Sequence, residues 1–135
     1  MSKKTDKQFD NDVSYKVHLS VNNMKKIEVA FFQSESGKEP VRDWLKTQSS
    51  ENRKVIGEDI KTAEYGWPIG MPTVRDLSGY KDLKEIRSSL PDKTISRVFC
   101  TVHEGKLVLL HAIIKKSQKA PKRELDLAMK RKKGL

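Results

Sequence analysis

Cysteine and long hydrophobic runs are the scarcest features of this 135-residue sequence. Cys100 is the only cysteine, so no disulfide can form within the chain and no cysteine pair is available for a metal. No apolar run is long enough to span a membrane, and no segment resembles a secretory signal. We therefore expect a cytoplasmic protein without a membrane partner, and a single reduced cysteine agrees with that location.

The motifs of the common nucleotide-binding and hydrolytic enzymes are missing as well. The sequence contains no GxGxxG, no P-loop, no HExxH and no GxSxG, and its histidines are not spaced as metal ligands. Nucleotide-dependent and zinc-dependent chemistry are therefore not expected. We predict neither a metal nor a cofactor.

Acidic residues are in the minority, because 18 Asp and Glu face 28 Lys and Arg and the net charge is +10. Such a charge attracts polyanions, and nucleic acid is the first candidate partner. Residues 115–133 hold nine Lys and Arg against two acids, a local net charge of +7. This basic segment is either a nucleic-acid footprint or only a solvated surface.

The length and the patterning indicate one folded domain. Residues 1–23 mix Lys and Asp with scattered apolar residues and show no period that could bury a face, so we interpret them as a flexible N-terminal extension or leader. Residues 24–135 are patterned throughout and are predicted to form a single domain.

The order of periodic segments predicts an α+β fold. A buried strand is expected in residues 25–33, and a helical hairpin is expected to begin at Pro40 and to end near Gly66 and Pro68. Period-two alternation then predicts three antiparallel strands, and a helix is expected after Pro121. We predict a small antiparallel sheet of about four strands, with the hairpin packed on one face and the helices all on that side.

Alternation in the strand of residues 94–103 predicts which side chains share a face. Val98, Cys100 and Val102 are expected to face the core, with Arg97 and Phe99 on the opposite side.

Pairing this strand with the preceding one, residues 84–90, brings Arg87 next to Arg97. Two adjacent guanidiniums can hold a phosphate, and Phe99 beside them could stack an RNA base. The alternative is that each arginine pairs with a carboxylate such as that of Glu85 or simply points into water.

A histidine and a group of lysines follow in the last predicted strand. His111 interrupts the apolar run LVLLHAII, and Lys115 and Lys116 come directly after it. Imidazole can transfer protons near neutral pH, so His111 is a candidate for that task, although a hydrogen-bonded structural histidine is the alternative.

Arginine, lysine and histidine without a metal suit one reaction in particular. In that reaction the RNA 2′-hydroxyl attacks the adjacent phosphate and cations stabilise the charge that grows on the phosphorane. One group takes the 2′ proton and another protonates the leaving 5′ oxygen.

Three segments of the chain resemble the phage-derived Gp49-like proteins, which are similar to HigB and RelE toxins. The resemblance covers about residues 24–133 and is carried by EPVRDWL, IGEDIKTAEYGWPIGMP and LKEIRSSLPDKTISRVFCTVHEGKLVLLHAIIKKSQKAPKRELDLAMKRK. It implies the toxin of a type II toxin-antitoxin system, neutralised by a helix-turn-helix, HigA-like antitoxin. It also implies a metal-independent endoribonuclease that cleaves mRNA, commonly on the ribosome, and so inhibits translation.

The resemblance further implies a concave basic site on the sheet face opposite the hairpin. We expect a catalytic set of Arg87, Arg97, His111, Lys116 and Lys119, and an RNA-binding set of Lys84, Phe99, Lys115, Lys122 and Arg123. No tyrosine or histidine follows Lys119, where several relatives have one, so His111, Lys116 and Lys119 all remain candidates for the general acid. The alternatives to an enzyme are a non-catalytic RNA-binding or ribosome-binding module and an inactive interaction protein.

Overall fold

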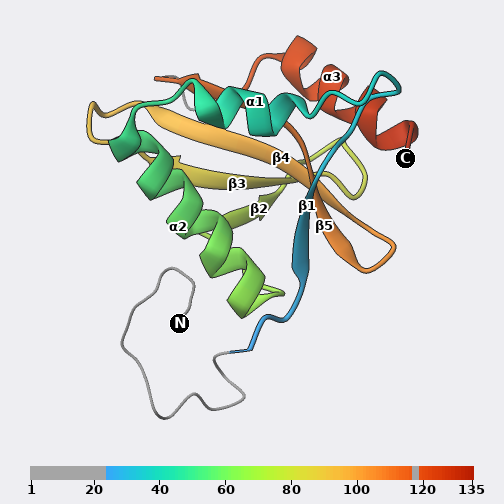
Figure 1. The fold of residues 1–135 in the computed structure, drawn as a ribbon, viewed down its shortest axis with the longest axis horizontal. Coiled ribbons are helices and arrows are strands. Elements are labelled where there is room, and N and C mark those ends of the chain that lie inside the picture. Colours follow the sequence, from blue (N-terminus) through green and yellow to red (C-terminus); the bar gives the residue numbers. More distant parts are fainter. Residues whose placement is uncertain (1–23, 117–118) are drawn as a thin grey trace.

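The computed structural model describes residues 24–116 and 119–135 (Figure 1). The predicted N-terminal extension, residues 1–23, lies outside the described residues. The elements in chain order are β1 (Glu28–Phe31), α1 (Pro40–Lys46), α2 (Ser50–Gly66), β2 (Val74–Asp76), β3 (Lys84–Ser89), β4 (Ile95–His103), β5 (Lys106–Lys115) and α3 (Lys122–Lys133).

The strands form one five-stranded mixed sheet in the order β1-β5-β4-β3-β2. β2, β3, β4 and β5 pair antiparallel, whereas β1 runs parallel to β5. The predicted α+β class and its three consecutive antiparallel strands are confirmed. The expectation of about four strands, all antiparallel, requires correction. β2 has only three residues, too few for alternation to reveal, and the direction of β1 depends on a partner far along the chain.

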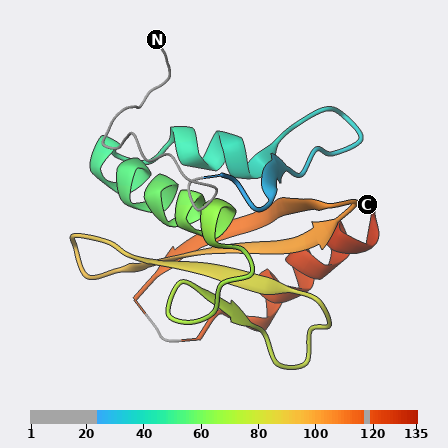
Figure 2. The same cartoon turned by 90° about the horizontal axis from the view of Figure 1, so that it is seen from below.

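Helices cover both faces of the sheet, as Figure 2 shows with α1 and α2 above it and α3 below it. The prediction that all helices lie on one side is therefore wrong. The physical reason is that β4 and β5 are apolar on both faces, so each face needs a cover.

Two hydrophobic clusters correspond to these two faces. In the first, the helices α1 and α2 contribute Val41, Ile56, Ile60 and Ala63, which pack against buried residues of β3, β4 and β5. In the second, Ala128 of α3 is buried together with Leu83, which precedes β3, and with Phe99, Val108, Leu110 and Ile113 of β4 and β5. α3 is therefore part of the packed domain.

A β-bulge in the pairing of β4 and β5 sets the orientation of the second half of β5. Phe99 pairs with His111, but the next residue of β4, Cys100, pairs with Leu109, so Leu110 has no partner across the ladder. Leu110 packs in the α3-side cluster, and the His111 ring stacks on that of Phe99 in the same layer. The bulge thus turns both residues toward α3.

The turn between β4 and β5 follows the sequence prediction at Glu104 and Gly105. Both residues have positive φ, 50° and 77°, as a tight hairpin turn that matches the strand twist requires. Val102, which was expected in the core, precedes this turn and is 47% exposed, because it lies outside both hydrophobic clusters. Cys100 faces the core as expected, and burial raises the pKa of its thiol to about 12.

Among the residues that the structure describes, no helix combines the length and the apolar character needed to cross a membrane.

Candidate functional site

The predicted arginine pair is present, since Arg87 of β3 lies directly opposite Arg97 of β4. Their environments differ, however. The Arg97 side chain is only 1% exposed, and its Nη1 donates to Oε2 of the buried Glu85 at 2.9 Å. For Arg97 the alternative of a carboxylate partner therefore holds. Arg87 is half-buried and remains accessible from solvent.

Phe99 does not have the exposure that a base-stacking residue needs. Its ring is completely buried in the cluster beneath α3, and its centroid lies 6.0 Å from that of the His111 ring. In this structure Phe99 is a core residue. The assignment of Phe99 to RNA stacking is therefore corrected. The sequence predicted no helix on the sheet face that carries Phe99, but α3 packs there.

His111 connects β5 to α3 through both of its ring nitrogens. Nε2 lies 2.7 Å from Oε1 of Glu124, and Nδ1 lies 3.4 Å from Nη1 of Arg131, which also donates to the Leu110 carbonyl oxygen. The hydrogen bond from His111 is the largest cause that lowers the pKa of Glu124, against the opposing effect of burial. The His111 side chain is 16% exposed. With both nitrogens engaged, it acts here as a structural link between the sheet and the helix.

Lys115, the last residue of β5, and Lys116, which follows it, lie at the same end of the sheet as Arg87. Lys115 pairs with Ile95, which pairs in turn with Ser89, two residues beyond Arg87. Hydrogen bonds from Thr94 are the main cause that lowers the pKa of Asp92 in the β3–β4 turn, and the charge of Lys116 adds a smaller effect. Lys116 and Lys119 are exposed. Four of the predicted site residues thus belong to one end of the molecule or to the segment that leaves it: Arg87, Lys115, Lys116 and Lys119.

The other predicted RNA contacts each have an acidic neighbour. Lys122 bonds Asp126 one turn later, and this contact raises the pKa of Lys122. Arg123 lies 3.4 Å from Oε2 of Glu124. Lys84 bonds Asp76 of β2 and lies three residues before Arg87, about 10 Å along the strand.

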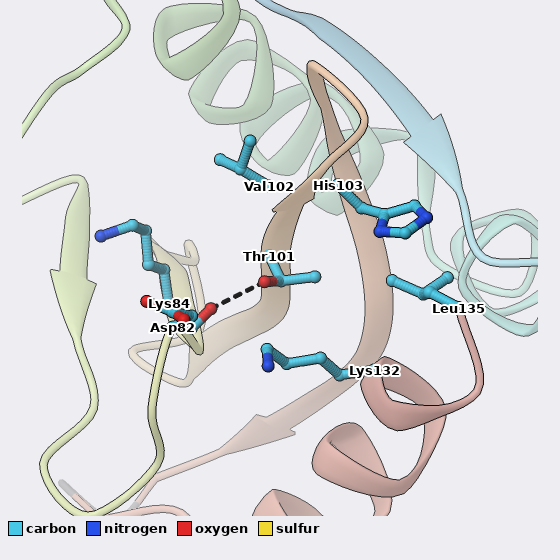
Figure 3. Close-up of a pocket in the computed structure, with 7 residues that line it drawn as sticks. All are labelled: Asp82, Lys84, Thr101, Val102, His103, Lys132 and Leu135. Carbon is cyan, nitrogen blue, oxygen red and sulfur yellow. Dashed lines mark hydrogen bonds between the residues drawn. The ribbon is translucent and has the colours of Figure 1, made fainter.

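A cleft lies beside the last turn of α3 (Figure 3). It is at the opposite end of the sheet from Lys115, because the β4–β5 ladder has His103 at one end and Lys115 at the other. It has a volume of about 340 Å³, and its walls are Asp82, Lys84, Thr101, Val102, His103, Lys132 and Leu135. Two of these residues are hydrogen-bonded to each other, since the Thr101 hydroxyl donates to the Asp82 carbonyl oxygen at 2.7 Å. The cleft carries positive charge, but it does not contain the arginine pair.

Sequence reasoning missed Arg75 of β2, which the sheet places directly opposite Glu85. The Arg75 Nε lies 4.0 Å from Glu85 Oε2, so one buried carboxylate has two guanidiniums around it. The only sequence signal for this strand was the alternation in VRD after Pro72. Three residues do not suffice to predict a strand.

Within residues 24–116 and 119–135, no group of three or more His, Cys, Asp or Glu side chains is arranged to hold a metal ion.

The fold and the site together define a class of protein: a small α+β domain with a helical hairpin on one face of a mixed sheet and basic side chains gathered at one sheet end. Residues 43–133 match the model of the phage-derived Gp49-like protein family. The chain therefore belongs to this family, which is part of the RelE/HigB-like toxin superfamily. A search of the curated proteins found no match. Family membership indicates a phage-derived toxin of a toxin-antitoxin pair, with an antitoxin as its partner.

Proposed function

We propose that this protein is an endoribonuclease toxin that cleaves mRNA on the ribosome without a metal and so inhibits translation. Its family membership supports the toxin class. The observation that carries the nuclease proposal is the partly exposed Arg87 at the same end of the sheet as Lys115 and Lys116. Arginine and lysine side chains so arranged suit a phosphodiester whose negative charge increases during the reaction.

In the proposed reaction the RNA 2′-hydroxyl attacks the adjacent phosphorus and gives its proton to water. The bond to the 5′ oxygen breaks, and a 2′,3′-cyclic phosphate forms. Arg87 donates hydrogen bonds to the phosphate oxygens as the phosphorane forms. The ammonium of Lys116 or Lys119 delivers a proton to the leaving 5′ oxygen. The ribosome orients the mRNA, which reduces the demand on a tuned base in the protein itself.

Arg97 contributes to this site indirectly. Its buried ion pair with Glu85 fixes the pairing of β3 and β4 at the level of Arg87. His111 is assigned a similar supporting role, because its two nitrogens already have partners. The catalytic roles that the sequence suggested for both residues thus become positioning roles in this proposal.

Induction of the chain in a bacterium, followed by mapping of mRNA 5′ ends after a few minutes, tests the proposal. New ends within translated frames are expected for the wild type. An Arg87→Ala variant is expected to lose about 10²–10³-fold in cleavage, the usual effect of losing one donor to a developing anion. Arg42→Ala is the matched control, because Arg42 is an exposed arginine of α1, and this helix packs against β1 and β5, at the other edge of the sheet from β2. Full cleavage by a folded Arg87→Ala variant would refute the assignment.

A second function has one observation in its favour. Arg97 and His111, two of the five predicted catalytic residues, are engaged in internal contacts. A non-catalytic protein that blocks translation by binding RNA or the ribosome would need only the exposed basic residues. Growth arrest with intact mRNA would support that function over the nuclease, and the absence of arrest would indicate an inactive interaction protein.

A further inference from the structure

A cavity at the β2 edge of the sheet is lined by charged and apolar side chains, most of which have no role in the proposed reaction. It has a volume of about 470 Å³, within the range of sites for small ligands. Its walls include Val55 and Asp59 from α2, Met71 and Pro72 from the following loop, and Arg75 and Arg87 from β2 and β3.

The two arginines of this cavity are close enough to grip one phosphate. Arg75 pairs with Glu85, and Arg87 lies two residues beyond Glu85 on the same strand, so the two arginines are diagonal neighbours on one sheet face. Diagonal neighbours lie about 7–8 Å apart, which long side chains span. Arg75 is 36% exposed and Arg87 is half-buried, so both side chains are partly exposed to solvent and line the cavity.

Glu85 acts beneath them as a positioning residue. Its Oε2 accepts from Arg97 and lies 4.0 Å from the Arg75 Nε. Its Oε1 accepts no hydrogen bond from the described residues, so the carboxylate retains capacity to orient Arg75. The buried Glu85 can thereby aim the guanidinium of Arg75 while the charge of Arg97 offsets its own. Arg75, Arg87 and Arg97 carry three positive charges against the two negative charges of Glu85 and Asp59, so a positive excess remains.

Apolar side chains form another part of the cavity wall, beside the arginines. Met71 is 75% exposed, unusual for a large apolar side chain, and Val55 and Pro72 line the cavity with it. The methionine thioether is polarisable and packs well against aromatic rings such as nucleobases. Phosphate-binding groups beside an apolar surface match the two halves of a nucleotide.

We propose that this cavity is a nucleotide subsite for single-stranded RNA, in which Arg75 joins Arg87 on the backbone phosphate and the base packs on Met71 and Pro72. The inference rests on the proposed function, because it assigns the RNA of that reaction to this edge of the sheet. Asp59 lines the same cavity and repels the phosphate, so its neutralisation strengthens binding.

The test measures binding of a 2′-O-methyl RNA oligonucleotide to the full chain by fluorescence anisotropy at several salt concentrations. This probe lacks the attacking hydroxyl, so the readout does not depend on cleavage. Arg75→Ala is expected to weaken binding at least tenfold and to reduce the salt slope by about one. Met71→Ala is expected to weaken binding with an unchanged salt slope, and Asp59→Asn is expected to tighten it. Arg42→Ala is the control and should bind as the wild type does.

The outcomes separate this inference from the nuclease proposal. If the wild type binds the probe with this pattern of variants but cleaves no mRNA, the subsite stands and the nuclease proposal falls. If the wild type cleaves mRNA and Arg75→Ala binds and cleaves like Arg42→Ala, the subsite is wrong and the nuclease stands. A wild type that does not bind the probe, or a Met71→Ala variant that binds normally, also overturns the subsite. Arg75→Lys keeps the charge but not the fork of donors, and should restore only part of the affinity.

Discussion

Replacement of Arg97 should lower the free energy of unfolding, so its effect on stability must be measured before any effect on catalysis is interpreted. In an Arg97→Ala variant the fully buried Glu85 loses its 2.9 Å ion pair and retains the weaker contact with Arg75, whose Nε is 4.0 Å away. Breaking one partner of a buried ion pair usually costs about 3–5 kcal/mol, because the remaining charge stays desolvated. For a domain of this size the loss corresponds to a fall in Tm of about 12–20 °C. Arg87→Ala, at a half-buried position, should cost less than about 1 kcal/mol.

Thermal and urea unfolding followed by circular dichroism measure these free energies directly. The informative companion is the double variant Glu85→Leu, Arg97→Met, which removes both charges and fills the space with apolar atoms. Because replacement of an entire buried ion pair is commonly neutral or stabilising, the double variant should recover most of the stability that Arg97→Ala loses.

Two results would refute this reasoning. One is a loss below about 1 kcal/mol for Arg97→Ala, which would be the behaviour of an exposed pair. The other is a double variant no more stable than Arg97→Ala, which would mean that the pair is not the source of the effect. If the prediction holds, loss of toxicity in an Arg97 variant reports on folding, and Arg87 is the arginine with which to test catalysis.

Three further perturbations test other contacts of the structure. The pKa of Glu124 is lowered in the folded state, chiefly by the hydrogen bond with His111, so this contact should stabilise the fold above the ordinary carboxyl range and lose its effect as the pH falls through the lowered pKa. The stability difference between wild type and Glu124→Gln should therefore be largest near neutral pH and vanish in acid, and an equal difference at all pH values would contradict the assignment. Cys100 is buried with a thiol pKa of about 12, so an alkylating reagent should label it only after unfolding, and rapid labelling of the native protein would be inconsistent with its burial. Gly57 lies inside α2 with no atom within 4 Å of an added Cβ, so Gly57→Ala should stabilise the protein by about 0.5–1 kcal/mol in urea unfolding, and a loss of stability would reveal a contact not present here.

The local elements and the family were readable from the sequence because they depend on short-range physics and on residue identity. The helical stripe of α2, the proline before α3 and the Glu104–Gly105 turn are all encoded within a few residues. Strand alternation was also enough to predict that Arg87 and Arg97 are neighbours, since pairing the apolar faces of two strands fixes the register.

Tertiary packing decided which of these neighbours is accessible. Alternation separates the two faces of a strand, but it does not tell which face a distant helix will cover, and α3 covers the one with Phe99. The β-bulge that turns His111 toward Glu124 and the three-residue β2 that brings Arg75 to Glu85 leave almost no local pattern. Arg75 belongs to the candidate site and Arg97 is a buried cation paired with Glu85. Neither fact could be predicted, because burial and charge pairing depend on residues far apart in the chain.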